Sequence, residues 1–292
     1  MKNKIKYVYS DLDGTIVSWN PKNQFTHQGK TYKNLHEVSH ATVTAFKQLQ
    51  AQGIKIGIVT GRDYCRVRWL EKYLNTDLPT ITLDGAIIYF RDEIIRQEVL
   101  DKEFIHGINQ IVKRYPTAAF KLNMGWGNYY TCNPSLIFEG DHAYREHFNA
   151  DSKFYRKEID NTVDWDINNM KVNQVYFDTF TCPEPMIQEL DNLVEKSDVT
   201  AKSYRHSLYI IKKGVSKASA LQNLQRDFLV EMKPANTIVF GDGDNDIEMM
   251  QWADHSVSLT GSDPECYKLA KYHTDSVDDD GIAKWINKNL LC

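Results

Sequence analysis

The chain has 292 residues, of which 42% are hydrophobic and 25% charged, and this balance excludes a disordered or fibrous protein. A formal net charge of −4 argues against nucleic acid or an anionic membrane as a partner. No apolar run approaches the roughly 20 residues of a membrane span, no signal peptide is evident, and the five cysteines match neither a zinc site nor a disulfide framework. We therefore expect a cytoplasmic protein with about two domains.

Short apolar strands alternate with helical segments in the first part of the chain. Ser39 is placed to cap a helix, and Gly53 stands where the C-terminal glycine of that helix is expected. The hydrophobic pattern predicts strands at residues 6–10, 54–60 and 80–83, with helices at 39–52 and 62–74. Strand–helix–strand alternation predicts a parallel sheet with helices on both faces.

The middle of the chain, residues 85–206, has a different character. It is rich in Tyr, Trp and Asn and contains alternating segments such as 171–177, which predict a mixed α+β unit. The first pattern then returns, with helices at 219–229 and 247–253 and strands at 237–240 and 256–259. We therefore expect an α/β fold in which residues 1–84 and 207–292 form a doubly wound parallel sheet with residues 85–206 inserted as a second domain.

Three strands of this sheet are predicted to end in polar turns that contain glycine. The turns are Asp11-Leu12-Asp13-Gly14-Thr15, Thr60-Gly61-Arg62 and Gly241-Asp242-Gly243-Asp244-Asn245-Asp246. Ligands of open parallel sheets bind at the C-terminal ends of the strands, so we expect the three turns to share one site. Residues two apart on an extended chain point the same way, which would place the carboxylates of Asp11 and Asp13 together. With Asp242 nearby, these carboxylates would repel one another unless a hard cation such as Mg²⁺ lies between them.

Acidic turns also occur in solvated loops, because Asp and Gly are common turn residues. Two such turns, each after a buried strand, favour a functional site. An EF-hand calcium loop is excluded for both turns, because Ile16 and Ile247 occupy the sixth position, where glycine is required.

The order and spacing of these motifs resemble the haloacid dehalogenase superfamily, and within it the Cof-type phosphatases with a large α/β cap. The matching segments are Asp11 to Thr15 for the first motif, Thr60 for the second, Lys217 in Gly214-Val215-Ser216-Lys217-Ala218 for the third, Gly241 to Asp246 for the fourth, and Asp278 to Ala283 near the end of the chain. The resemblance implies a Rossmann-like core, a cap domain inserted into it that selects the substrate, and Mg²⁺-dependent hydrolysis of a small phosphorylated metabolite.

The resemblance also implies the catalytic roles. Asp11 would be the nucleophile that becomes an aspartyl-phosphate, and Asp13 the general acid and base. Mg²⁺ would be held by the carboxylates of Asp11 and Asp242 and by the backbone carbonyl of Asp13. An aspartate two residues after the nucleophile favours a phosphatase or a phosphomutase over the metal-free dehalogenases and the ion-pumping ATPases of the superfamily.

Phosphate binding is the other implied role. The phosphoryl oxygens would be bound by Thr60, the Gly61 backbone N–H, Lys217 and Asn245, and Asp246 would position Lys217.

Two features of the sequence depart from the family pattern. Asp84 stands where the family usually has asparagine before Gly-Ala, and the loop at residues 16–38 is longer than usual. The sequence assigns neither of them a role.

Several alternatives are open or can be rejected. A sugar phosphomutase of the same superfamily is the closest rival, and a non-catalytic protein that binds a phosphometabolite is another. The segment from His36 to His40 matches the zinc-protease pattern His-Glu-x-x-His, but it straddles a predicted helix start. Cys65 cannot serve a cysteine phosphatase, because Glu71 stands where such an enzyme requires arginine.

The substrate and the oligomeric state are not specified by the sequence. The family accepts sugar phosphates, pyridoxal phosphate and flavin mononucleotide, and both a monomer and a homodimer are compatible with the chain. An aromatic-rich segment of the inserted domain, which we expect mainly to pack in its core, could instead stack on a sugar or a flat ring. Its members are Trp126, Tyr129, Tyr130, Tyr144 and Phe148.

Overall fold

The computed structural model describes residues 4–18, 24–27, 30–33, 37–130, 155–204 and 206–291. The chain divides into two compact units, each of which is described by itself. The first unit comprises Met1–Arg62, Arg66–Ile95 and Ser216–Cys292, and the second comprises Asp63–Cys65 and Arg96–Val215. None of the helices in the described part of the chain has the length and apolar character of a membrane span.

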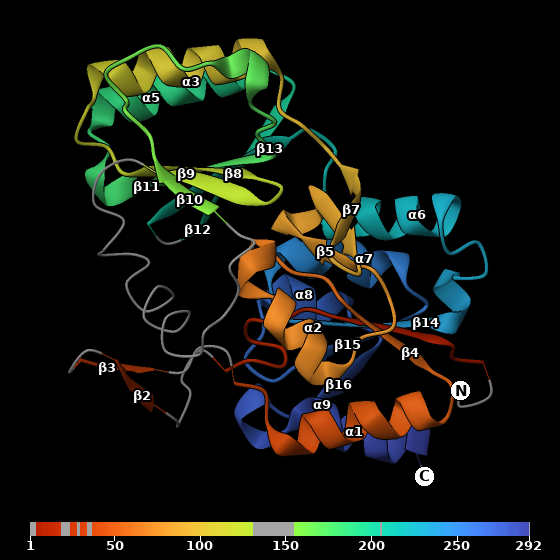
Figure 1. The fold of residues 1–292 in the computed structure, drawn as a ribbon. Coiled ribbons are helices and arrows are strands. Elements are labelled where there is room, and N and C mark those ends of the chain that lie inside the picture. The colour runs from red at the N-terminus through yellow and green to blue at the C-terminus, as the bar shows by residue number, and fades with distance from the viewer. Residues whose placement is uncertain are drawn as a thin grey trace. The chain divides into compact units, whose positions relative to one another are not determined.

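A five-stranded parallel sheet forms the centre of the first unit (Figure 1). Its strands, in spatial order, are β16 (Tyr272–Thr274), β15 (His255–Leu259), β14 (Thr237–Gly241), β1 (Tyr7–Ser10) and β4 (Lys55–Ile58). Every pair of neighbours is parallel. The predicted parallel sheet is therefore confirmed, and the C-terminal ends of β1 and β14 lie side by side at its centre.

Helices cover both faces of this sheet. One core contains Val8 of β1 and side chains of α1 (His40–Ala51), α2 (Arg68–Leu74) and α9 (Gly281–Ile286). The other contains Tyr7 and Tyr9 with side chains of α6 (Lys217–Asp227), α7 (Ile247–Trp252) and α8 (Pro264–Leu269). Alternate residues of β1 thus face opposite cores, which is the doubly wound arrangement expected from the sequence.

The first predicted helix begins where expected, whereas the second begins later than predicted. Ser39 caps α1 by accepting a hydrogen bond from the Thr42 N–H, as expected. The helix predicted at residues 62–74 is shorter, because α2 begins only at Arg68. Before α2, the backbone of Arg62 forms hydrogen bonds outside a helix. Its N–H donates to Thr60 Oγ1, and its carbonyl accepts from the Leu83 N–H.

Smaller elements complete the first unit. After β1, β2 (Gln24–His27) pairs antiparallel with β3 (Lys30–Lys33). The strands β5 (Thr80–Thr82), β6 (Ile87–Phe90) and β7 (Glu93–Gln97) form a three-stranded sheet. Over the two units, short 3-10 turns lie at Tyr64–Arg66, Leu83–Gly85, Ile167–Asn169, Thr179–Thr181, Pro234–Asn236, Asp244–Asp246 and Val277–Asp279, and a π-helical turn at Asn287–Leu291.

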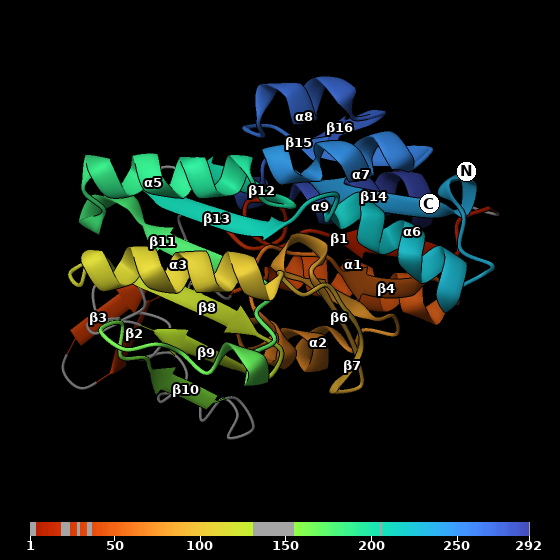
Figure 2. The same cartoon turned by 90° about the horizontal axis from the view of Figure 1, so that it is seen from above.

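In its described residues, the second unit is a mixed sheet with the helices α3 (Lys102–Arg114) and α5 (Glu184–Glu195) packed against it. The strands, in spatial order, are β10 (Tyr155–Glu158), β9 (Gly127–Tyr130), β8 (Phe120–Met124), β11 (Gln174–Asp178), β13 (Ser207–Lys212) and β12 (Val199–Tyr204). In Figures 1 and 2, α3 and α5 run side by side along one face. Leu122, Val175 and Phe177 belong to the core shared with these helices, so this unit is α+β, as its sequence pattern predicts.

Candidate active site

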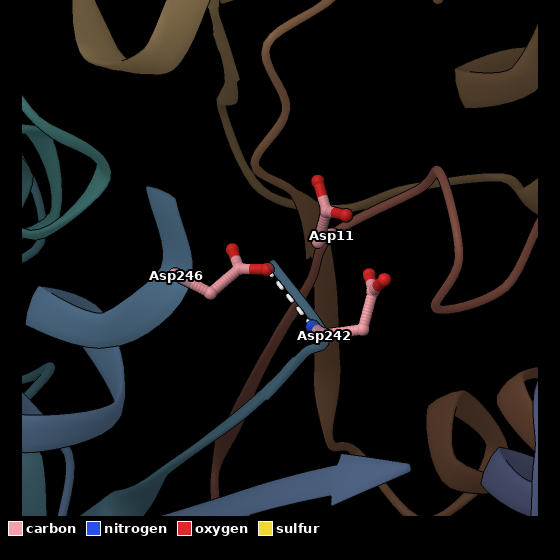
Figure 3. A group of neighbouring side chains, drawn as sticks. All are labelled: Asp11, Asp242 and Asp246. Atoms are coloured by element: carbon pink, nitrogen blue, oxygen red, sulfur yellow. Dashed lines mark hydrogen bonds between the residues drawn. The ribbon is translucent and has the colours of Figure 1, made fainter. Parts of the chain in front are cut away.

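Two adjacent strand ends bring the first and fourth motifs together. Asp11 directly follows β1, and its backbone N–H bonds to the carbonyl of Phe240 in β14 at 2.9 Å. Asp242 directly follows β14. Figure 3 shows the side chains of Asp11 and Asp242 close together, with Asp246 reaching toward them from the turn that follows. One oxygen from each of these three carboxylates lies within 4.8 Å of the other two.

Lys217 lies against this group of carboxylates. It is the first residue of α6, and its side chain is fully buried. Nζ donates to Oδ1 of Asp11 and to Oδ1 of Asp246, at 2.7 Å in each case. Burial alone would lower the pKa of Lys217, but the charges of Asp11, Asp246 and Asp84 outweigh it and raise the pKa, so the amine stays protonated.

Asp246 organises the loop that carries Asp242. Its Oδ2 accepts hydrogen bonds from the backbone N–H groups of Asp242 and Gly243, both at 2.9 Å, and the first of these is drawn in Figure 3. Its Oδ1 is used by Lys217. Asp246 therefore links the loop after β14 to the buried lysine, and Thr15 adds a hydrogen bond to Asp242 Oδ1 at 2.8 Å.

The crowded carboxylates are electrostatically costly without a cation. Burial, aided by the neighbouring carboxylates, raises the pKa of Asp11 well above its usual range even though Lys217 opposes the shift. Burial and the charge of Asp246 likewise raise the pKa of Asp242 to about 7. Because the donors are all oxygens and a divalent ion would favour their ionised forms, the residues present fit Mg²⁺, with Asp11 and Asp242 as the carboxylate ligands.

Asp13 lies close enough to Asp11 and Asp242 for its charge to contribute, as a minor cause, to the raised pKa of both groups. Its carboxylate is not part of the group formed by Asp11, Asp242 and Asp246. It faces Arg62, whose Nε and Nη2 donate to its two oxygens. The chain leaves the extended conformation after Asp11, because the Ile16 and Val17 N–H groups fold back onto the Leu12 carbonyl. The shared orientation of the Asp11 and Asp13 carboxylates stays a prediction.

The sequence predicts Arg62 only as part of the Thr60-Gly61-Arg62 turn, without a role of its own. Its side chain is almost completely buried, which is rare for an arginine unless it is paired, as here with Asp13. The only signal in the sequence is its position directly after Thr60 and Gly61, at the end of the second motif.

The second motif meets the fourth through Asp84. Thr60 is fully buried, and a Cβ on Gly61 would lie 3.1 Å from Asp84 Oδ1. The same oxygen of Asp84 accepts a hydrogen bond from Nδ2 of Asn245 at 2.8 Å. The residues that the sequence singled out for catalysis, phosphate binding or metal binding all belong to the first unit, as do Arg62 and Asp84.

Other residues considered in the sequence lie elsewhere. His36 is outside the described residues, and α1 begins at His40, so Glu37 and His40 do not share a helix as a zinc protease requires. In the second unit, Trp126 packs edge-on against Tyr64, with ring centroids 5.5 Å apart. The side chains of Tyr129 and Tyr130 and the residues Tyr144 and Phe148 are outside the described part of the chain.

Comparison with known proteins identifies the family. The sequence model of the haloacid dehalogenase-like hydrolases matches residues 8–286. The chain belongs to this family. A Mycoplasma genitalium protein with a provisional phosphatase name is 66% identical over 292 residues, which is 100% of both chains. The family match and this relative identify the haloacid dehalogenase-like chain as a phosphatase.

Solved structures of the family share the fold. A haloacid dehalogenase-like hydrolase from Bacteroides thetaiotaomicron superposes with a TM-score of 0.76 at 20% identity, covering 98% of this chain and 99% of the other. A subclass IIB sugar phosphatase of the superfamily gives 0.74 at 20% identity, covering 97% and 98%. The fold of this haloacid dehalogenase-like phosphatase is therefore that of the capped members of the superfamily.

Proposed function

We propose that this phosphatase hydrolyses a small phosphorylated metabolite, a sugar phosphate or a similar compound, with Mg²⁺ and through an aspartyl-phosphate on Asp11. The observation that carries the proposal is the placement of the buried Lys217 ammonium, 2.7 Å from both Asp11 and Asp246, next to Asp242. The sugar-phosphatase activity named for one structural neighbour supports the substrate class.

In the first half of the reaction, a carboxylate oxygen of Asp11 attacks phosphorus. An Asp11 O–P bond forms, the P–O bond to the metabolite breaks, and Asp13 gives a proton to the departing alkoxide. Lys217, already bonded to Asp11, offsets the negative charge that builds up between nucleophile and phosphate. Mg²⁺, when held by Asp11, Asp242 and the Asp13 carbonyl, would supply further neutralisation of the phosphoryl oxygens.

In the second half, the Asp13 carboxylate accepts a proton from a water molecule. The resulting hydroxide oxygen attacks phosphorus, the Asp11 O–P bond breaks, and inorganic phosphate leaves with the Asp11 carboxylate restored. Thr60, the Gly61 N–H, Lys217 and Asn245 bind the phosphoryl oxygens throughout. Arg62, which grips both oxygens of Asp13, holds this group in one orientation.

Asp11→Asn tests the mechanism, because it keeps the size of the side chain and removes the nucleophilic charge. Wild type assayed on a panel of phosphorylated metabolites with Mg²⁺ should release inorganic phosphate, and EDTA should stop the release. Mass spectrometry of acid-quenched wild type should find a phosphoryl group on the peptide that contains Asp11. The variant should show neither activity nor the phosphorylated peptide.

Asp227→Asn is the matched control, because Asp227 pairs with Arg226 on the surface of the same unit. It should behave as wild type. Activity of Asp11→Asn near that of wild type would refute the mechanism. Formation of an isomerised sugar phosphate in place of free phosphate would show a phosphomutase instead.

A further inference from the structure

The turn that carries Asp84 has an unusual backbone. Leu83, Asp84 and Gly85 have positive φ values of 49°, 54° and 109° in succession. The left-handed region is disfavoured for leucine, tolerated by aspartate and easy for glycine. The turn is held by hydrogen bonds from the Leu83 N–H to the Arg62 carbonyl and from the Asp84 N–H to the Thr60 carbonyl, both at 3.1 Å. A costly conformation is thus fixed against the second motif.

The same turn is also packed against the third motif. A Cβ on Gly85 would lie 2.3 Å from the carbonyl oxygen of Ser216, so only glycine fits there. Ser216 caps α6 and immediately precedes Lys217. The turn is therefore fixed on two sides, and its position determines where the Asp84 carboxylate lies.

From this position, Asp84 contacts the fourth motif. Its Oδ1 accepts a hydrogen bond from Asn245 Nδ2 at 2.8 Å. A carboxylate can only accept, so the Asn245 amide must turn its nitrogen toward Asp84. An asparagine at position 84, the usual residue of the family, could donate as well as accept and would leave both orientations of the amide possible.

We propose that Asp84, whose carboxylate lies beside Gly61, is a positioning residue that fixes the orientation of the Asn245 amide for binding of the phosphoryl group. The inference rests on the proposed function, in which Gly61 and Asn245 both bind phosphoryl oxygens. Asp84, at which this chain departs from its family, thereby receives a role. Its substitution should weaken phosphate binding by changing the orientation of the Asn245 amide.

Two substitutions at position 84 separate backbone from side chain. Asp84→Gly keeps the left-handed backbone and removes the acceptor, whereas Asp84→Asn keeps the shape and one acceptor. Asp84→Gly should raise KM and the inhibition constant of inorganic phosphate about 10- to 100-fold, the value of one hydrogen bond to a charged group, with kcat changed less than about threefold. Asp84→Asn should fall between this variant and wild type.

A double-mutant cycle with Asn245→Ala tests whether the effect passes through the amide. Asp84→Gly combined with Asn245→Ala should bind phosphate no more weakly than Asn245→Ala alone. Fully additive losses would overturn the proposal, and so would unchanged phosphate inhibition in Asp84→Gly. Phosphate binding by Asp84→Asn that is tighter than in wild type would also overturn it, because the charge of Asp84 would then outweigh its positioning effect.

Circular dichroism and a thermal melt check that each variant is folded. If Asp84→Gly does not fold, the same cycle is run with Asp84→Asn. Wild type that releases no phosphate from any substrate would refute the proposed function, whereas active wild type with an unaffected Asp84→Gly variant would refute only the positioning role.

Discussion

The guanidinium of Arg62 donates two hydrogen bonds to the carboxylate of Asp13, from Nε to Oδ2 at 2.7 Å and from Nη2 to Oδ1 at 2.5 Å. The Arg62 side chain is 2% exposed and that of Asp13 23%, so salt screens this partly buried pair less than a pair on the surface. The planar fork of an arginine matches both oxygens of a carboxylate and fixes its plane. Arg62 therefore determines how the proposed acid and base meets the leaving group.

Arg62→Lys should impair proton transfer more than binding. A lysine keeps the charge but cannot bond both oxygens in a plane, and the loss of one charge-assisted hydrogen bond should reduce kcat/KM for an alkyl phosphate by about 10- to 100-fold. The reduction should be smaller for p-nitrophenyl phosphate, whose leaving group needs little protonation. Steady-state kinetics on both substrates measures the difference.

Arg226→Lys is the control for this prediction, because Arg226 makes the same two-pronged contact with Asp227 at the surface. It should leave both substrates unaffected. Equal losses of Arg62→Lys on the alkyl and the aryl phosphate would contradict a positioning role, since they would indicate general damage to the site.

Asp246→Asn should break the hydrogen-bonded link between Lys217 and the loop after β14. The carboxylate accepts from two backbone N–H groups through Oδ2 and from the Lys217 amine through Oδ1, and an amide has only one oxygen for these donors. At least one buried donor loses this acceptor, which should cost about 1–3 kcal/mol of stability and lower kcat at least about 10-fold. Chemical denaturation and phosphate-release assays measure the two effects.

Asp244→Asn is the comparison for Asp246→Asn, because Asp244 lies in the same turn and is exposed. It should retain both stability and activity. If Asp246→Asn kept the stability and the kcat of wild type, the linking role of this carboxylate would be wrong.

Gly85→Ala should displace the segment before Lys217. The new Cβ would lie 2.3 Å from the Ser216 carbonyl at a φ of 109°, so it adds a steric clash to the backbone strain. We expect destabilisation by more than about 2 kcal/mol and a loss of activity, measured by denaturant unfolding and phosphate release.

Gly214→Ala is the matched control. Gly214 also has a positive φ, 77°, but a Cβ there would have nothing within 4 Å, so this variant carries the strain alone. It should lose only about 1 kcal/mol. Similar losses in the two variants would mean that the contact with Ser216 is unimportant.

Much of the fold and the site could be predicted from local patterns. The segments of β1 and β14 are short, apolar and bounded by turns, and such segments reveal buried parallel strands without knowledge of the tertiary structure. The neighbouring ends of β1 and β14 then bring Asp11 and Asp242 together, because ligand sites lie at the C-terminal ends of parallel strands.

The remainder depends on contacts between distant residues. Arg62 and Asp13 are 49 positions apart, and Asp84 and Asn245 are 161 apart, so no local pattern pairs them. Such contacts also explain why the α-helix begins later than predicted. Arg62 bonds to Asp13 and Leu83, and the α-helix does not begin until Arg68. Here tertiary hydrogen bonds overcome helix propensity.

Metal binding should reverse the dependence of stability on pH. Burial and the charge of Asp246 raise the pKa of Asp242 to about 7, and burial also raises that of Asp11, so the metal-free folded state holds protons that the unfolded chain has already lost. Stability from these groups is complete below their unfolded pKa near 4 and is lost as pH rises through about 7. Without metal, the melting temperature should decrease as the pH is raised from about 5 to about 8.

Mg²⁺ favours the ionised carboxylates, so it should raise the melting temperature much more at about pH 8 than at pH 5. The Asp242→Asn variant has no titrating proton at this position. Its melting temperature without metal should therefore depend less on pH, and Mg²⁺ should raise that temperature less than in wild type. Asp227→Asn, at the surface, should keep both features of wild type. Calorimetry at both pH values, with Mg²⁺ and with EDTA, measures these shifts. An equal Mg²⁺ effect at the two pH values would show that the ion does not compete with protons for Asp11 and Asp242, and that it binds elsewhere.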